Sequence, residues 1–165
     1  MFCQKGHRVS EDFAELDDVD KQLLRWLQQD ATLSNAELGE RLALSVTPCW
    51  RRRKRLEGLG YIQGYQANLN RRKLGLGVLA FAQVRFDSPA GSAADWFEQA
   101  VQALPQVLSC HKVTGEADFA LTIVAPDLES YGQFVENVLR KQPGITTIHS
   151  SLALREIKNI SRLPL

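Results

Sequence analysis

Apolar residues recur at helical spacing near the start of the chain. Leu16, Val19, Leu23 and Leu27 follow one another at intervals of three or four residues, which places them on one face of a helix. Asp17 stands where a residue that caps the helix N-terminus is expected. The pattern predicts an amphipathic helix that buries one face against the rest of its domain.

A second and a third helix follow after short breaks. Ser34 and Glu37 form a capping-box pattern, in which each side chain accepts a hydrogen bond from a backbone N–H group. The third helix has two candidate caps, Ser45 and Thr47, of which Thr47 precedes Pro48 in the first turn. Because only about four residues separate these helices, they must cross steeply, as in a helix-turn-helix.

The pattern becomes extended after the third helix. Residues 61–69 hold Tyr, Ile, Tyr and Leu between glycines and predict a strand that acts as a wing or a hinge. Residues 71–77 are turn-like and carry the domain boundary. The predicted organisation is a disordered leader over residues 1–15, a helix-turn-helix domain over 16–65, a hinge over 66–77 and a second domain over 78–165.

The second domain alternates strand and helix patterns. Strands are predicted over 78–86, 107–113, 119–124 and 145–157, and helices capped by Ser92 and Asp127 bury Trp96 and Leu128 among others. The order βαββαβ is typical of a ferredoxin-like domain, in which both helices cover one face of a four-stranded antiparallel sheet. The fold class is therefore α+β, a winged helix-turn-helix domain followed by a ferredoxin-like domain.

The first strand of the second domain is apolar on both faces. Every second residue from Val78 to Phe86 is apolar, and Leu79 and Phe81 add apolar side chains to the opposite face. A sheet face that water covers is normally polar. Since the chain offers no further helix for that face, we expect a second subunit to cover it. The protein is thus predicted to be a homo-oligomer, either a dimer or an octamer.

Positive charge is concentrated in one part of the chain. The formal net charge is only +1, yet eight cations between Ser45 and Lys73 stand against one acid, Glu57. The other twelve cations face eighteen acids. A local basic block on an otherwise acidic chain is typical of a surface that binds a polyanion.

The third helix carries most of this block. A helical wheel points Cys49 and Leu56 inward and places Thr47, Arg51, Lys54 and Arg55 on the opposite arc, with Arg52 on one flank. It places Arg53 near the inward side, where its stem has to pack while its charged head reaches water. A solvated surface helix is the alternative interpretation. However, such a face normally mixes both charge signs, whereas five successive cations repel one another unless a polyanion neutralises them.

We therefore expect this helix to enter the major groove of duplex DNA. Thr47 and Arg51, near the helix start, suit base edges, and Arg52 and Arg55 suit phosphates. The predicted DNA-binding residues are Ser45, Thr47, Pro48, Trp50, Arg51, Arg52, Lys54 and Arg55.

Several short motifs together are similar to those of a known family. They are Leu16–Asp20, Leu27–Asp30, Leu44–Cys49, Arg55–Glu57, Ile62–Tyr65 and Thr114–Asp118. From about residue 16 to its end the chain resembles the Lrp/AsnC, or feast/famine, transcription regulators. The resemblance implies a bacterial regulator that dimerises through its sheet domain, often forms octamers and binds small molecules between dimers. Arg53 departs from the family pattern, which usually has an aliphatic residue at this place.

The motif of residues 114–118 resembles the family's effector loop. A free amino acid needs an anion receptor for its carboxylate and a hydrogen-bond acceptor for its ammonium group. Gly115 lets backbone N–H groups turn toward the carboxylate, and Glu116 or Asp118 can accept from the ammonium group. A plain polar turn is the alternative. The predicted effector is cysteine, leucine, methionine or another branched-chain amino acid. The predicted effector-binding residues are Thr114, Gly115, Glu116, Ala117 and Asp118, with Ser150 and Ser151 from a neighbouring subunit.

Other classes of protein are disfavoured by the sequence. No apolar run is long enough to span a membrane and no signal peptide is present, so we expect a cytoplasmic protein that joins the nucleoid when bound to DNA. The three cysteines and three histidines are scattered, which predicts no metal and no cofactor. Cys110 and His111 point to opposite strand faces and cannot act as a nucleophile and its base, so we expect no enzyme activity.

Overall fold

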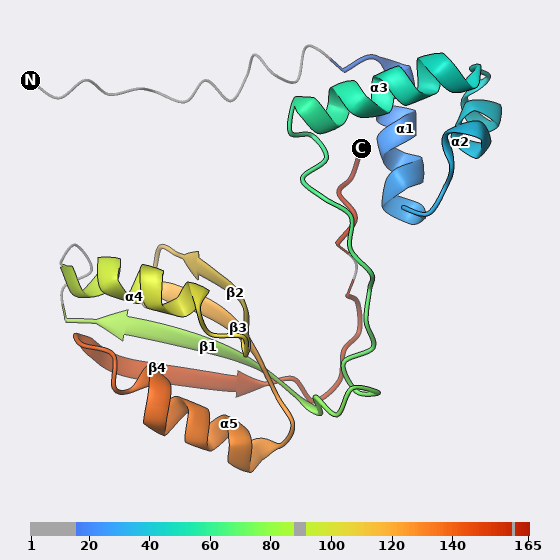
Figure 1. Ribbon diagram of the computed structural model, residues 1–165. Coiled ribbons are helices and arrows are strands. Elements are labelled where there is room, and N and C mark those ends of the chain that lie inside the picture. The colour runs from blue at the N-terminus through green and yellow to red at the C-terminus, as the bar shows by residue number, and fades with distance from the viewer. Residues whose placement is uncertain (1–15, 88–91, 160) are drawn as a thin grey trace, which may run out of the picture. The chain divides into compact units, whose positions relative to one another are not determined.

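The computed structural model describes residues 16–87, 92–159 and 161–165 (Figure 1). Within this part the chain forms two compact units. One contains the residues up to Ala67 together with Asn159–Leu165, and the other contains Asn68–Lys158. The leader predicted over residues 1–15 and the capping side chain predicted at Ser92 lie outside the described residues.

Three helices of the first unit share one core. Leu23 and Leu27 from the first helix meet Leu38 from the second and Cys49 and Leu56 from the third, and all five side chains are buried. This confirms the apolar stripe of the first helix and the inward direction of the third. The helices are α1 (Asp18–Gln29), α2 (Asn35–Leu42) and α3 (Val46–Gly58).

The first two helices of this unit begin with the caps that their sequences predict. The Asp17 side chain accepts a hydrogen bond from the backbone N–H of Asp20 at 2.8 Å and caps α1. Ser34 and Glu37 form the predicted capping box of α2. Of the two candidates for α3, Ser45 occupies the N-cap position, although its side chain makes no capping hydrogen bond. The cap at Thr47, which the sequence favoured over Ser45, is therefore wrong.

The turn between α2 and α3 is tight. Ala43 ends α2 in the left-handed conformation, with φ of 53°. A Cβ atom on Gly39 would lie 2.7 Å from the carbonyl oxygen of Leu44, closer than real Cβ contacts allow. The absence of a side chain at Gly39 therefore lets the backbone after α2 turn closely past the helix and begin α3.

The strand predicted over residues 61–69 is wrong. After α3 the N–H groups of Tyr61 and Ile62 donate to the carbonyl oxygen of Leu56, at 3.0 and 3.3 Å, and these two bonds end the helix. Residues 62–70 then have no regular secondary structure. Apolar residues between glycines favour an extended chain, but a strand also requires a partner whose backbone groups complete the ladder.

The second unit is a four-stranded antiparallel sheet with the order β2-β3-β1-β4. The predicted βαββαβ order and ferredoxin-like class are confirmed, although the last strand ends at residue 152 and not at 157. The elements are β1 (Val78–Phe86), α4 (Ser92–Gln102), β2 (Val107–Lys112), β3 (Phe119–Ala125), α5 (Leu128–Phe134), a π-helical turn (Val135–Leu139) and β4 (Ile145–Leu152).

Both helices of this unit pack on the same face of the sheet. Phe86, Phe97 and Phe119 come from β1, α4 and β3 and meet edge to face, with ring centroids 5.1 to 5.6 Å apart. Tyr131 and Phe134 of α5 belong to the same buried cluster. The cluster therefore joins each helix to the alternating inward residues of the strands.

Some apolar side chains lie outside this core. Trp96 and Leu128 were predicted to face inward but are 68% and 61% exposed. Trp96 immediately precedes the buried Phe97, and consecutive helical residues point about 100° apart, so only one of them faces the sheet. Phe81 is 48% exposed on the sheet face opposite the helices, as the two-faced pattern of β1 predicts.

Replacing Ala43 with glycine tests the strain in the tight turn. The left-handed conformation is costly for alanine and not for glycine, while the unfolded chain gains freedom, so Ala43→Gly should raise the stability of the first unit by about 0.5–1 kcal/mol. Thermal unfolding followed by circular dichroism measures this. Ala36→Gly, at an exposed site inside α2, is the matched control and should lower stability by roughly 1 kcal/mol. Equal losses in both variants would contradict the strain.

Candidate DNA-binding face and effector loop

The outer face of α3 is exposed as the helical wheel predicts. Thr47, Arg51 and Lys54 point away from the buried Cys49 and are exposed to water. Trp50 lies beside them and is 47% exposed. Ser45 and Pro48 are exposed at the helix start. The structure therefore brings these predicted DNA-binding residues onto one accessible surface.

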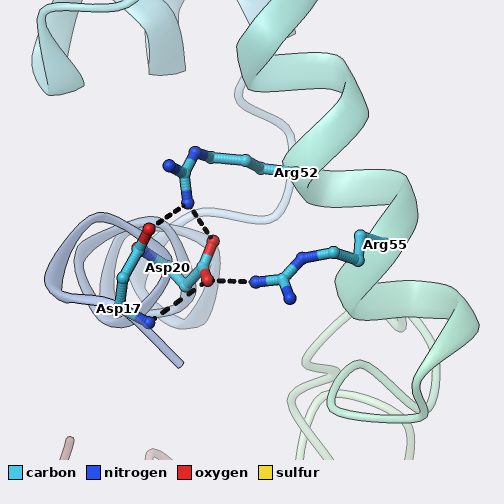
Figure 2. A network of polar contacts seen from close by, with 4 residues as sticks. All are labelled: Asp17, Asp20, Arg52 and Arg55. Atoms are coloured by element: carbon cyan, nitrogen blue, oxygen red, sulfur yellow. Dashed lines mark hydrogen bonds and ion pairs between the residues drawn. The ribbon is translucent and has the colours of Figure 1, made fainter. Parts of the chain in front are cut away.

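Arg55, predicted on the outward arc, is instead held together with Arg52 by carboxylates of α1, on a different side of α3 (Figure 2). Asp20 is fully buried, and its two oxygens accept from Arg52, at 2.9 Å, and from Arg55. Arg52 also reaches Asp17, at 2.5 Å. A buried carboxylate without partners would be strongly destabilising, so the two guanidinium groups make its burial possible.

The contacts of Asp17 also change the pKa of this capping carboxyl group. The backbone N–H of Asp20 and the Arg52 guanidinium lower the pKa of Asp17 below its ordinary value. A carboxylate with a lowered pKa stabilises the folded state above its unfolded pKa, and this contribution is lost as the pH falls through its folded pKa. The contact between α1 and α3 is therefore weakened in acid.

Arg53 stands where an aliphatic residue was expected, and its surroundings explain how it fits. Its guanidinium lies 4.8 Å from the centre of the Tyr65 ring, its Nε donates to Tyr65 Oη at 2.9 Å, and one NH1 group reaches the carbonyl oxygen of Leu33. Tyr65 Oη in turn donates to Glu57 at 3.0 Å. The stem of Arg53 is thus packed, as predicted from the wheel, but its charged head is paired within the unit and does not reach into water as predicted.

Most of the basic run is neutralised inside the unit. Arg53 and Lys54 pair with Glu57, at 3.4 and 2.7 Å, and the Lys54 ammonium lowers the pKa of that carboxyl. Arg52 and Arg55 pair with carboxylates of α1. Within the described part of the chain, Arg51 is the member of the run for which no carboxylate partner is found. The repulsion expected among five successive cations is therefore largely relieved without any polyanion.

Asp17 and Asp20 were not predicted from the sequence as partners of the basic helix. A signal was present, because Asp20 lies four residues after Leu16 and three before Leu23, on the apolar stripe of α1. A carboxylate on a buried stripe needs a cation nearby. The run of arginines in α3 could have supplied that partner.

The loop between β2 and β3 has the backbone that its glycine predicts. Gly115 has φ of 118°, a conformation that other residues rarely adopt. The Asp118 carboxylate accepts from the backbone N–H of Phe86 at 2.7 Å, so it fastens the loop to the end of β1. Glu116 is exposed at the loop tip. Of the two predicted ammonium acceptors, Glu116 thus has the carboxylate that faces water.

The two predicted serines lie elsewhere on the sheet. Ser150 and Ser151 belong to β4, which is separated from β3 by β1, and two strand spacings amount to about 10 Å. The Ser150 hydroxyl accepts from Tyr131 Oη at 2.6 Å on the side covered by α5. Ser151 pairs with Phe81 in the register of β1 and β4. One chain therefore does not gather both serines at its own loop.

Residues 16–87, 92–159 and 161–165 hold neither a candidate metal site nor a membrane-spanning helix. They contain no group of three or more His, Cys, Asp or Glu side chains that could hold a metal ion. None of their helices is long and apolar enough to cross a membrane. Burial raises the pKa of the Cys49 and Cys110 thiols.

Each of the two units matches a domain of known proteins. Residues 16–57 match the AsnC-type helix-turn-helix domain, and residues 79–163 match the Lrp/AsnC ligand binding domain. The leucine-responsive regulatory proteins of Klebsiella pneumoniae and Escherichia coli K12 are each 36% identical to the chain over 149 residues, which cover 90% of it and 91% of each relative.

Solved structures show the same arrangement of elements. A transcriptional regulator from Neisseria meningitidis in complex with L-Met is 39% identical, with a TM-score of 0.87 over 90% of this chain and 96% of that one. An AsnC family regulator from Agrobacterium tumefaciens is 33% identical, with a TM-score of 0.85 over 90% and 97% of the two chains.

The chain is a transcriptional regulator that combines a helix-turn-helix DNA-binding domain with a ligand-binding domain. It belongs to the Lrp/AsnC family.

Proposed function

We propose that this regulator binds a specific duplex DNA site through the outer face of α3, and that a small amino acid bound at the loop over residues 114–118 changes its DNA affinity or assembly. The observation that carries the proposal is the exposed arc of Thr47, Arg51 and Lys54 on a helix fixed by a buried ion-pair network. As a DNA-binding regulator the protein would act in the cytoplasm, in association with the nucleoid.

The residues of α3 divide into two groups in this proposal. Thr47 and Arg51, in the N-terminal half of the helix, contact base edges, because that half enters the major groove most deeply. Lys54, whose side chain is itself exposed, reaches the DNA backbone when it leaves its partly buried partner Glu57. Arg52 and Arg55, which the sequence assigned to phosphates, serve mainly to hold α3 on α1 through Asp20.

The proposed assembly is a homodimer formed through the sheet face that α4 and α5 leave uncovered. Phe81 is exposed there, and Leu79 lies two residues before it on the same face. A second copy would bury both side chains and present two recognition helices to successive major grooves. Dimers of this kind could join into octamers. Sedimentation velocity decides the mass, and a monomer at micromolar concentration would contradict the assembly.

The proposed effector is an amino acid such as methionine, leucine, cysteine or another branched-chain amino acid. The Neisseria regulator in complex with L-Met and the leucine-responsive relatives support this class. In the loop, the left-handed Gly115 turns backbone N–H groups toward the carboxylate, and Glu116 accepts from the ammonium. Thr114 and Ala117 complete the loop, and Ser151 is available to a neighbouring subunit from β4.

Arg51→Ala tests the DNA-binding face. Loss of a base contact should weaken binding by about 1–3 kcal/mol, without changing thermal stability, because Arg51 has no carboxylate partner among the described residues. Fluorescence anisotropy with DNA from upstream of the protein's own gene, at two salt concentrations, measures the change. Arg140→Ala, at the exposed residue that directly follows the π-helical turn of the ligand-binding domain, is the matched control and should bind like the original chain. Equal affinities for all three proteins would refute the assignment.

Glu116→Ala tests the effector loop. The original chain should change its DNA affinity when L-methionine or L-leucine is added, by a coupling energy of about 1–3 kcal/mol. The variant should lose this response, since the ammonium group loses its acceptor. Glu129→Ala removes an exposed carboxylate at the start of α5 and should keep the response. A full response in the Glu116 variant would show that the effector binds elsewhere.

A further inference from the structure

The last residues of the described chain lie against α1 in the first unit (Figure 1). The backbone N–H of Leu163 donates to Gln28 Oε1 at 2.6 Å, and Gln28 Nε2 donates to the carbonyl oxygen of Leu163 at 3.3 Å. Arg25 Nε donates to the backbone oxygen of Leu165 at 2.6 Å. Residues about 140 positions apart in the chain are thereby joined by three hydrogen bonds.

The side chains of Arg25 and Gln28 match the backbone groups of residues 163–165 in spacing and in chemistry. Arg25 and Gln28 are three residues apart and neighbours on one helix face. In an extended segment the backbone oxygens of Leu163 and Leu165 point to the same side, about 6–7 Å apart. Leu163 also presents its own N–H and C=O groups together on one side. A glutamine amide, which has one acceptor and one donor, can satisfy both groups. Residues 25 and 28 therefore form a site for an extended backbone.

The sequence of the segment favours the docked conformation. Leu163 precedes Pro164, and a residue before proline avoids the helical region and stays extended. Proline also fixes its own φ angle, which lowers the conformational entropy that docking has to remove. The segment thus enters its site with its backbone already close to the bound form.

This contact gives the DNA-binding unit a second attachment. The chain leaves the first unit after Ala67 and returns to it at Asn159, beyond β4 of the ligand-binding domain. The same helix that holds the segment at Gln28 holds α3 at its other end, through the buried Asp20. A covalent path followed by two sets of contacts therefore links β4, the segment, α1 and the recognition helix.

We propose that Arg25 and Gln28 form a docking site for residues 161–165 of the same chain, and that this contact carries the effector response of the ligand-binding domain to α3. The inference rests on the amino-acid response proposed above. Hydrogen bonds at an exposed surface are individually weak, so the segment can leave its site, and its covalent link keeps its effective concentration near the site high. An effector that shifts β4 therefore strengthens or weakens the contact between residues 161–165 and α1.

The experiment compares the original chain with Gln28→Ala and with Gln29→Ala. The second variant is the matched control, because Gln29 is an exposed glutamine of α1 and, among the described residues, the hydrogen bonds to the segment come from Arg25 and Gln28. Two readouts are taken on each full-length protein. Hydrogen–deuterium exchange at short times reports the protection of the peptide that contains Leu163. Fluorescence anisotropy reports DNA affinity with and without L-methionine and L-leucine.

The expected result is faster exchange at Leu163 in the Gln28 variant alone. Its DNA affinity without an amino acid should stay within about twofold of the original, because α3 is unchanged, while the effect of the amino acid should fall toward none. Equal exchange in all three proteins would overturn the docking site, and a full amino-acid effect in the Gln28 variant would overturn its role as the link. If the original chain itself shows no amino-acid effect, the proposed effector function fails instead.

Discussion

The burial of one carboxylate determines how the DNA-binding unit is built. Asp20 is fully buried where α1 meets α3, and the guanidinium groups of Arg52 and Arg55 compensate for its loss of water. This requirement fixes the rotation of α3 about its own axis more firmly than the small apolar contacts of Cys49 and Leu56 would alone. Once that rotation is fixed, Arg51 has to face outward.

The cations of α3 therefore have two different roles, which the sequence alone does not distinguish. The cations that pair within the unit give α3 its position, and the exposed arc around Arg51 is left for a polyanion. The contact between Gln28 and Leu163 acts on the same framework from the other end of α1. Helix α1 is therefore the part of the unit through which both the recognition helix and the ligand-binding domain are connected.

Local patterns predicted most of the fold, and long-range partners account for what they missed. The alternation in β1 and the capping box at Ser34 depend on near neighbours, so the sequence defines them well. The pairing of Asp20 with Arg52 joins residues 32 positions apart, and the charge run by itself indicated only a polyanion. For the candidate sites, the sequence predicted the exposure of Arg51 and the turn at Gly115, but it could not show that Asp118 is engaged by the backbone of the sheet.

The central claim, that Arg52 is an internal partner of Asp20 and not a phosphate contact, is tested most directly by the salt dependence of DNA binding in Arg52→Ala. Each phosphate contact contributes about one unit to the slope of log affinity against log salt concentration. The account predicts an unchanged slope and a lower melting temperature, because the buried carboxylate loses a partner. A slope smaller by about one unit with an unchanged melting temperature would contradict it.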